Sequence, residues 1–236
     1  MKKASDKLIV ALDVDTLEEA KKLVKALGSR VTIYKVGSHL FTAYGPQAVE
    51  FLIKEKKKVF LDLKFHDIPN TVANAVKSVA GLNIFMLTIH VQGGEEMMKI
   101  AAQAAQKAGT KRPFVLGITV LTSESNRNNI PQLVLERAQL AKKCGLDGVV
   151  ASAQEAKMIS EKLGKDFIIV TPGIRPSGVT TGPDRIVGAG DQKRVSTPFD
   201  AISNGSHFLI VGRPIIEAEN PAAATDQILK EIDKAL

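Results

Sequence analysis

The feature that most constrains the fold of this chain is a short apolar run followed by a longer amphipathic stretch, repeated eight times along 236 residues. Short continuous apolar runs are typical of parallel strands that helices bury on both faces. We therefore predict eight strands, each followed by helical sequence. The predicted strands cover residues 8–12, 31–36, 59–63, 84–89, 114–120, 148–151, 167–170 and 208–211.

Several of the helices expected between these strands have recognisable ends. Asp15 or Thr16 is expected to cap the first helix, and Gly28 is expected to close it. Proline is favoured in the first turn of a helix because its missing N–H has no partner there in any case. Three prolines are each expected near the start of a later helix: Pro46, Pro131 and Pro198.

Eight strand-helix units in one chain of this length favour a single (β/α)8 TIM barrel, which typically has about 250 residues. An open doubly wound sheet is the main alternative, but it usually carries a glycine fingerprint after its first strand, where this chain has Asp13-Val14-Asp15-Thr16. Two small domains also fit the length, although no linker interrupts the pattern. We predict one barrel domain over residues 1–236, with its active site at the C-terminal ends of the strands.

The composition narrows the location of the protein. Its one cysteine, Cys144, cannot form an intramolecular disulfide, and most secreted domains carry several. Met1-Lys2-Lys3 is not followed by the apolar segment of a signal peptide, and no apolar run approaches the length of a membrane span. We expect a cytoplasmic protein that does not contact a membrane.

The formal net charge of +7 admits nucleic acid, an acidic surface or a small anionic substrate as partner. The densest basic run, Lys54 to Lys58, falls where a helix should end, and no aromatic residue lies within it. Solvated cations at a helix C-terminus are therefore favoured over a nucleic-acid patch. Because the four histidines and Cys144 show no zinc-type spacing, no metal site is expected.

Charged residues gather at the predicted C-terminal ends of the first three strands. They are Asp13, Lys35, Asp62 and Lys64. Asp62 and Lys64 lie two residues apart, so a regular strand would project both side chains to the same face. An ion pair that merely closes the barrel is one interpretation, but four such charges together favour a functional site. His90, after the fourth strand, is expected to be a hydrogen-bonded core residue outside the site.

The third strand continues as Asp62-Leu63-Lys64-Phe65-His66-Asp67-Ile68-Pro69-Asn70-Thr71, which resembles the signature of the orotidine 5'-phosphate decarboxylase family. The resemblance extends in order over nearly the whole chain. Its other positions are Asp13, Lys35, Gly37, Gly117 to Ser123, Thr171 to Arg175, Asp191 to Arg194 and Val211 to Pro214. It implies a homodimeric (β/α)8 barrel with shared active sites and without cofactor or metal, which converts orotidine 5'-phosphate to UMP and CO2 in pyrimidine biosynthesis.

The resemblance also implies roles for individual residues. Lys35, Asp62 and Lys64 would form the catalytic network of one subunit, and Asp67 and Thr71 would reach into the partner's site. From the residues alone, a helix N-cap is the favoured interpretation of Asp67. The implied substrate-binding residues are Asp13 and Lys35 with Thr71, Thr122 for the pyrimidine edge, and Arg175, Gln192, Gly212 and Arg213.

A phosphate site formed by Gln192, Gly212 and Arg213 also agrees with general barrel architecture, because the loops after strands seven and eight often bind phosphate. A simple helix-start turn is the other interpretation of Gly212. Residues 176–191 form a long glycine-containing segment that is expected to be a mobile loop, with a solvated insertion as the alternative. Arg185 in that segment leaves open how it and Arg175 divide their roles.

The residue types favour an electrostatic mechanism. The chain has no cofactor motif that could delocalise the electrons left at C6 of orotidylate after CO2 departs. The charges of Lys35, Asp62, Lys64 and Asp67 sum to zero, and flanking carboxylates favour the ammonium form of Lys64, which could protonate C6. The closest rival is a metal-dependent phosphate-sugar enzyme such as a hexulose-phosphate synthase, and a basic nucleic-acid-binding module is the rival from another class.

Overall fold

Eight parallel strands form a closed barrel in which each strand pairs with its neighbours in sequence and β8 pairs with β1. This computed structural model describes residues 3–121, 129–177 and 194–236. The predicted (β/α)8 barrel is confirmed, and the strands agree with the predicted ranges to within about two residues at either end. They are β1 Leu8–Ala11, β2 Ile33–Gly37, β3 Lys58–Phe65, β4 Met86–His90, β5 Phe114–Ile118, β6 Gly148–Val150, β7 Ile168–Thr171 and β8 Phe208–Val211.

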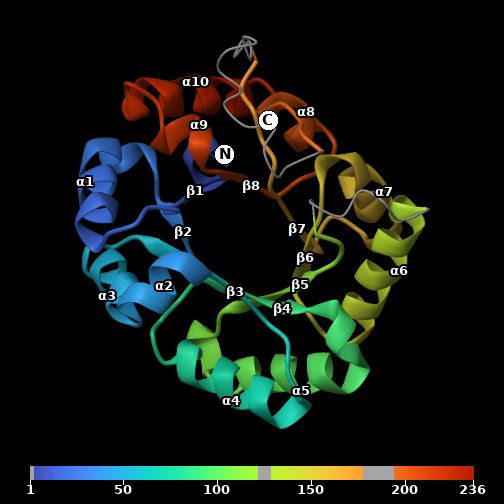
Figure 1. Ribbon diagram of the computed structural model, residues 1–236. Coiled ribbons are helices and arrows are strands. Elements are labelled where there is room, and N and C mark those ends of the chain that lie inside the picture. The colour runs from blue at the N-terminus through green and yellow to red at the C-terminus, as the bar shows by residue number, and fades with distance from the viewer. Residues whose placement is uncertain (1–2, 122–128, 178–193) are drawn as a thin grey trace.

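Helices surround the barrel on all sides, as Figure 1 shows. The α-helices are α1 Leu17–Leu27, α2 Ser38–Tyr44, α3 Gln47–Lys54, α4 Pro69–Ala80, α5 Gly94–Gln106, α6 Ile130–Lys143, α7 Ala153–Leu163, α8 Pro198–Ser203, α9 Arg213–Ile216 and α10 Pro221–Asp233. Short 3-10 turns add η1 Ala4–Asp6, η2 Gly28–Arg30, η3 Val91–Gly93 and η4 Gly109–Lys111. Among the described residues, no helix combines the length and the hydrophobicity that crossing a membrane requires.

Local sequence sets the helix ends much as expected. Thr16, rather than Asp15, caps α1, because its hydroxyl accepts a hydrogen bond from the Glu19 N–H while the Glu19 carboxylate accepts one from the Thr16 N–H. Gly28 closes α1 at a φ of 55°, a left-handed conformation that glycine adopts without strain. The three prolines are confirmed near helix starts: Pro46 precedes α3, and Pro131 and Pro198 lie in the first turns of α6 and α8.

The basic run Lys54 to Lys58 is only partly the solvated helix end that its sequence suggested. Lys54 ends α3, and Lys56 beyond it is exposed. Lys57 instead donates hydrogen bonds to the carbonyl oxygens of Gly28 (2.6 Å) and Val31 (2.9 Å). The solvated interpretation is wrong for Lys57, because tertiary folding brings these two backbone carbonyls after α1 within its reach.

The barrel interior is filled from its N-terminal end. Side chains alternate along each strand, so one set points into the barrel and the other packs under the helices. The inward set is Ile9, Ala11, Ile33, Phe60, Met86, Leu116, Val170 and Ile210. Below it, the ring of Phe85 packs edge-on against those of Phe114 and Phe208. This apolar plug leaves the C-terminal ends of the strands as the open end of the barrel.

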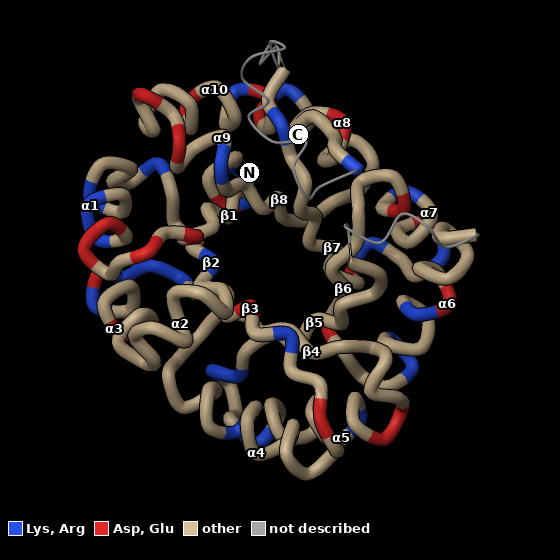
Figure 2. The backbone as a smooth tube through the Cα atoms, viewed as in Figure 1, with Lys and Arg blue, Asp and Glu red and all other residues tan. Residues whose placement is uncertain are grey.

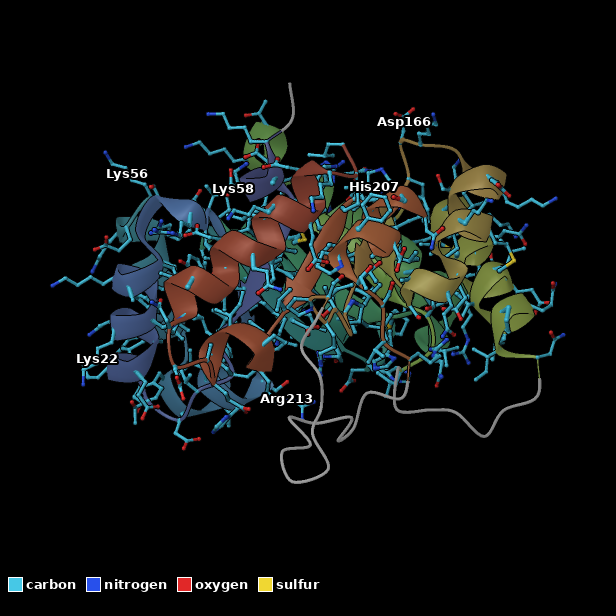
Figure 3. The ribbon with its side chains drawn as sticks, turned by 90° about the horizontal axis from the view of Figure 1, so that it is seen from above. Lys22, Lys56, Lys58, Asp166, His207 and Arg213 are labelled. Carbon is cyan, nitrogen blue, oxygen red and sulfur yellow. The ribbon has the colours of Figure 1, made fainter. Side chains whose placement is uncertain are left out.

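Charged residues lie on the outer helices and at the open end of the barrel. Figure 2 shows acidic and basic residues interspersed over the outer helices, with a further group beside β1, β2 and β3 at the barrel opening. Figure 3 shows Arg213 at the opposite end of the barrel from Lys58 and His207. The predicted mobile loop, residues 176–191, lies outside the described residues except for Pro176 and Ser177.

Candidate active site

A cavity of about 640 Å³ opens at the C-terminal ends of the strands, a volume typical of small-molecule sites. It is lined by ends of strands and by the loops that follow them, where TIM barrels place their active sites. The cavity brings together seven of the predicted site residues: Asp13, Lys35, Asp62, Lys64, Arg175, Gly212 and Arg213.

Four of these side chains form a continuous chain of ion pairs. Lys35 Nζ lies 2.9 Å from Asp13 Oδ1 and 3.9 Å from Asp62 Oδ2. Lys64 Nζ lies 2.9 Å from the same Asp62 oxygen. Signs alternate along the chain, so each charge is flanked only by opposite ones.

Burial divides this chain into an inner and an outer part. Lys35 and Asp62 are only 8% and 7% exposed, and they compensate each other's desolvation. The side chains of Asp13 and Lys64 are 52% and 37% exposed toward the cavity. The two outer groups are therefore available to a ligand, and the inner pair fixes where they stand.

Thr88 on β4 organises the third strand end. Its hydroxyl donates a hydrogen bond to Asp62 Oδ1 and accepts one from the backbone N–H of Lys64, both at 2.9 Å. Thr88 is fully buried. Sequence reasoning did not identify it, and the only signal was a hydroxyl within the apolar run of the fourth strand.

The backbone at Lys64 departs from the regular strand that the spacing of Asp62 and Lys64 suggested. Lys64 has a φ of 52°, and the pairing of β3 with β4 shifts between Leu61 and Phe65. A left-handed conformation is strained for a residue with a side chain and concentrates at functional sites. The ion pair confirms that the two side chains point the same way, although the strand is irregular at Lys64.

His90 ends β4 beside this network. Its ring centroid lies 5.3 Å from that of His66, and its buried Nδ1 has no hydrogen-bond partner among the described residues. Burial lowers the pKa of His90, and the nearby charges of His66 and Lys64 lower it further. The prediction of a hydrogen-bonded core histidine is therefore wrong at Nδ1, because the end of β4 lies beside His66 and Lys64 rather than within apolar core.

Asp67 and Thr71 are not brought into the cavity of their own chain. Both are exposed and neither lines it. Asp67 Oδ1 accepts a hydrogen bond from the N–H of Ile68 at 2.7 Å. Ile68 is itself the N-cap residue of α4, so the interpretation of Asp67 as the cap is wrong. These residues form an exposed loop edge beside the cavity.

The adjoining side of the cavity, at β7 and β8, carries two arginines. Gly212 precedes α9, which begins at Arg213, so this glycine does lie at a helix start. A Cβ added at Gly212 would lie 3.7 Å from Asp13 Oδ2 and 3.6 Å from the Ala11 side chain, inside the cavity. Arg175 reaches the cavity from the loop after β7. Two guanidinium groups at one end form a suitable site for a phosphate.

Arg194, the last residue of the predicted Asp191 to Arg194 motif, is anchored away from the cavity. Its Nη1 lies 2.6 Å from Glu155 Oε1 on α7, and both side chains are nearly fully buried. Burial raises the pKa of Glu155, and the charge of Arg194 opposes that effect. Thr122, Gln192 and Arg185 lie outside the described residues. Within the described residues, no group of three or more His, Cys, Asp or Glu side chains is arranged to hold a metal ion.

Known proteins resemble this chain over nearly its full length. The protein of Aliivibrio fischeri strain MJ11 named Orotidine 5'-phosphate decarboxylase is 45% identical over 238 residues, covering 98% of this chain and 97% of its own. The protein of the same name from Legionella pneumophila strain Lens is 45% identical over 235 residues, covering 96% and 99%.

Solved structures show the same relationship. The crystal structure of orotidine 5'-phosphate decarboxylase from Lactobacillus acidophilus has a TM-score of 0.83 at 38% identity, covering 97% of this chain and 99% of that one. The enzyme from Pyrococcus horikoshii OT3, at 24% identity and a TM-score of 0.76, shares the fold. A family model described as Orotidine 5'-phosphate decarboxylase / HUMPS family matches residues 6–228. The chain therefore belongs to the orotidine 5'-phosphate decarboxylase / HUMPS family.

Proposed function

We propose that this protein decarboxylates orotidine 5'-phosphate to UMP and CO2, the reaction that completes UMP in pyrimidine biosynthesis. The observation that carries the proposal is the chain of ion pairs from Asp13 through Lys35 and Asp62 to Lys64, set in a cavity that Arg175 and Arg213 also line. Relatives named for this activity match nearly the whole chain and support the same conclusion.

The substrate would lie across the cavity with its phosphate on the β7 and β8 side. Arg213 and Arg175 provide the cations, and Gly212 provides a backbone that a phosphate oxygen can approach closely. Asp13, with Lys35 behind it, would bind the ribose hydroxyls. Two residues outside the described part complete the assignment: Gln192 at the phosphate and Thr122 at the pyrimidine edge.

Lys64 would supply the chemistry at C6. When the bond from C6 to the carboxylate breaks, CO2 leaves and the electron pair remains on C6; an ammonium beside that carbon stabilises the pair and then donates a proton to it. Two unit charges about 4 Å apart interact by about 4 kcal/mol at an effective dielectric constant near 20. Asp62, held by Thr88, keeps the ammonium in place and adds repulsion toward the substrate carboxylate.

A second copy of the chain would complete each site. Asp67 and Thr71 face solvent beside the cavity opening, and Ile68 between them is 68% exposed, which is unusual for isoleucine. We place Asp67 and Thr71 in the partner's site of a homodimer, where Asp67 would bring the summed charge of Lys35, Asp62 and Lys64 to zero. Pairing would also cover Ile68.

The proposal includes no cofactor and no metal, and it places the protein in the cytoplasm, where the buried free thiol of Cys144 would stay reduced. A metal-dependent phosphate-sugar synthase is the second candidate, because the family also includes HUMPS proteins. The full-length relatives named decarboxylases favour the first.

A spectrophotometric assay separates the two candidates. Purified protein is mixed with orotidine 5'-phosphate in the presence and absence of EDTA, and the absorbance change of orotidylate is followed. We expect equal turnover in both. Turnover that EDTA abolishes would contradict the metal-free mechanism, and no turnover under either condition would overturn the proposed function.

A further inference from the structure

Helix α10, in the outer ring, holds the loop that carries Arg175. Both carboxylate oxygens of Glu231 accept hydrogen bonds from Ser177, one from its N–H at 2.8 Å and one from its hydroxyl at 3.0 Å. The Gln227 side-chain amide donates to the Ser177 carbonyl oxygen at 2.9 Å. Because Gln227 and Glu231 lie four residues apart, they share one face of the helix. Every polar group of Ser177 is therefore held by α10.

We propose that Glu231 is a positioning residue for Arg175 and, through it, for the 5'-phosphate of the substrate. This inference rests on the proposed phosphate role of Arg175. Glu231 does not line the cavity, and its side chain acts only through the loop. It is 9% exposed, so its charge is placed in the protein interior and is compensated there by the two donors of Ser177.

The geometry of the loop explains how such a contact reaches Arg175. The Arg175 N–H donates to the carbonyl oxygen of Ser196, just before α8, at 2.9 Å, and the Ser196 N–H donates to the carbonyl oxygen of Gly173 at 3.1 Å. Downstream, only Pro176, which is buried and has a fixed φ, separates Arg175 from Ser177. The backbone of Arg175 is thus tied on one side to the chain before α8 and on the other to α10.

The same helix also supports the second arginine. Helix α10 packs against α9, the short helix that begins at Arg213. One outer element therefore contacts both segments that supply cations to the cavity. A helix in this place can fix the distance between the two guanidinium groups without touching the substrate, as supporting residues do around other binding sites.

Affinity for UMP tests the proposal, because binding does not depend on turnover. The variants are Glu231→Ala, Glu231→Gln, Arg175→Ala and the double variant Glu231→Ala with Arg175→Ala. Asp226→Asn is the matched control, since Asp226 is a carboxylate on the same helix whose ion pair goes to Arg30 instead. Gln227→Ala, at an exposed position, serves as a second probe of the loop should Glu231→Ala fail to fold.

We expect Glu231→Ala to weaken UMP binding about tenfold, the scale typical of losing a supporting hydrogen bond to a charged group. Glu231→Gln keeps one acceptor oxygen and should recover most of that loss, and Gln227→Ala should weaken binding by about threefold. In the Arg175→Ala background, Glu231→Ala should cause no further loss, because its effect passes through Arg175. Asp226→Asn should bind as the unmutated protein does.

An equal loss from Glu231→Ala with and without Arg175 would overturn the proposal and make Glu231 a purely structural residue, as would unchanged UMP affinity in Glu231→Ala. If Glu231→Ala does not fold, unchanged affinity in Gln227→Ala would do the same. Turnover of orotidine 5'-phosphate by the unmutated protein is measured in parallel. Its absence would refute the proposed function, while the UMP affinities still decide the role of Glu231.

Discussion

The two sides of the cavity are built in different ways. On the side of β1 to β3, charged groups stand on strands or directly after them, and they fix one another through ion pairs. On the side of β7 and β8, Arg175 and Arg213 come from a loop and a helix start, and the outer helix α10 holds both segments. Reacting groups thus rest on the rigid barrel, and the groups assigned to the phosphate depend on more distant support.

Removing the ammonium of Lys64 should give the largest effect. It tests the side of the cavity at β1 to β3, which holds the reacting groups and is called the chemical side below. Lys64→Ala should reduce decarboxylation by at least about 10²-fold, the lower range for a general acid, because it removes the ammonium that we assign to protonate C6. UMP binding should persist, since Arg175 and Arg213 are intact. The checks are steady-state turnover and calorimetric titration with UMP. Turnover within about tenfold of the unmutated rate would remove Lys64 from the proton-donor role.

The comparison becomes sharper if the chemical side is completed by a second chain. Lys64→Ala and Asp67→Asn should each be inactive alone, but unfolding and refolding them together should create mixed dimers in which one site has both an intact Lys64 and an intact Asp67. With random pairing of equal amounts, about one quarter of the unmutated activity should return. Native mass spectrometry verifies the mixed dimers. Their formation without recovered activity would place Asp67 outside the partner's site.

A variant on the other side should separate binding from chemistry. Arg213→Ala should reduce kcat/KM for orotidine 5'-phosphate by about tenfold to a thousandfold, because a charge-assisted pair with phosphate is lost. The slow decarboxylation of orotidine, which has no phosphate, should stay nearly unchanged. Parallel kinetics with both substrates provide the measurement. Equal losses for the two substrates would show that Arg213 is structural and that phosphate binding and chemistry are not separated between the two sides.

The smallest of these effects concerns the support of the chemical side. Thr88→Val removes the hydroxyl that holds Asp62 and the Lys64 N–H, and we expect kcat to fall by about tenfold, with UMP affinity nearly unchanged. Thr225→Val is the control, because it removes another fully buried hydroxyl, which donates only to the Pro221 carbonyl within α10. A loss of kcat as large in the control would assign the effect to general destabilisation.

Local sequence was sufficient for much of this architecture. Apolar runs predicted all eight strands because burial on both faces makes most positions of a short parallel strand apolar. Thr16 and Gly28 marked the ends of α1 because capping involves only neighbouring residues. The charges at the strand ends were predicted to meet for a similar reason, since a closed parallel barrel brings every strand's C-terminal end to one opening.

Other features came from contacts that are distant in sequence. The hydrogen bonds of Thr88, those of Lys57 and the attachment of Ser177 to Glu231 each join segments that no local pattern relates. The Nδ1 of His90, which has no hydrogen-bond partner among the described residues, was likewise invisible in the sequence.

By itself, the sequence determined that this protein is a (β/α)8 barrel with a charged opening, and its motifs indicated the family. Tertiary structure alone decided how those charges are paired, that Lys64 adopts a left-handed conformation, and which outer helix holds the Arg175 loop. The physical reason is the range of the interactions involved. Periodicity and capping act over a few residues, whereas a buried charge is satisfied by whichever polar group the completed fold brings within reach.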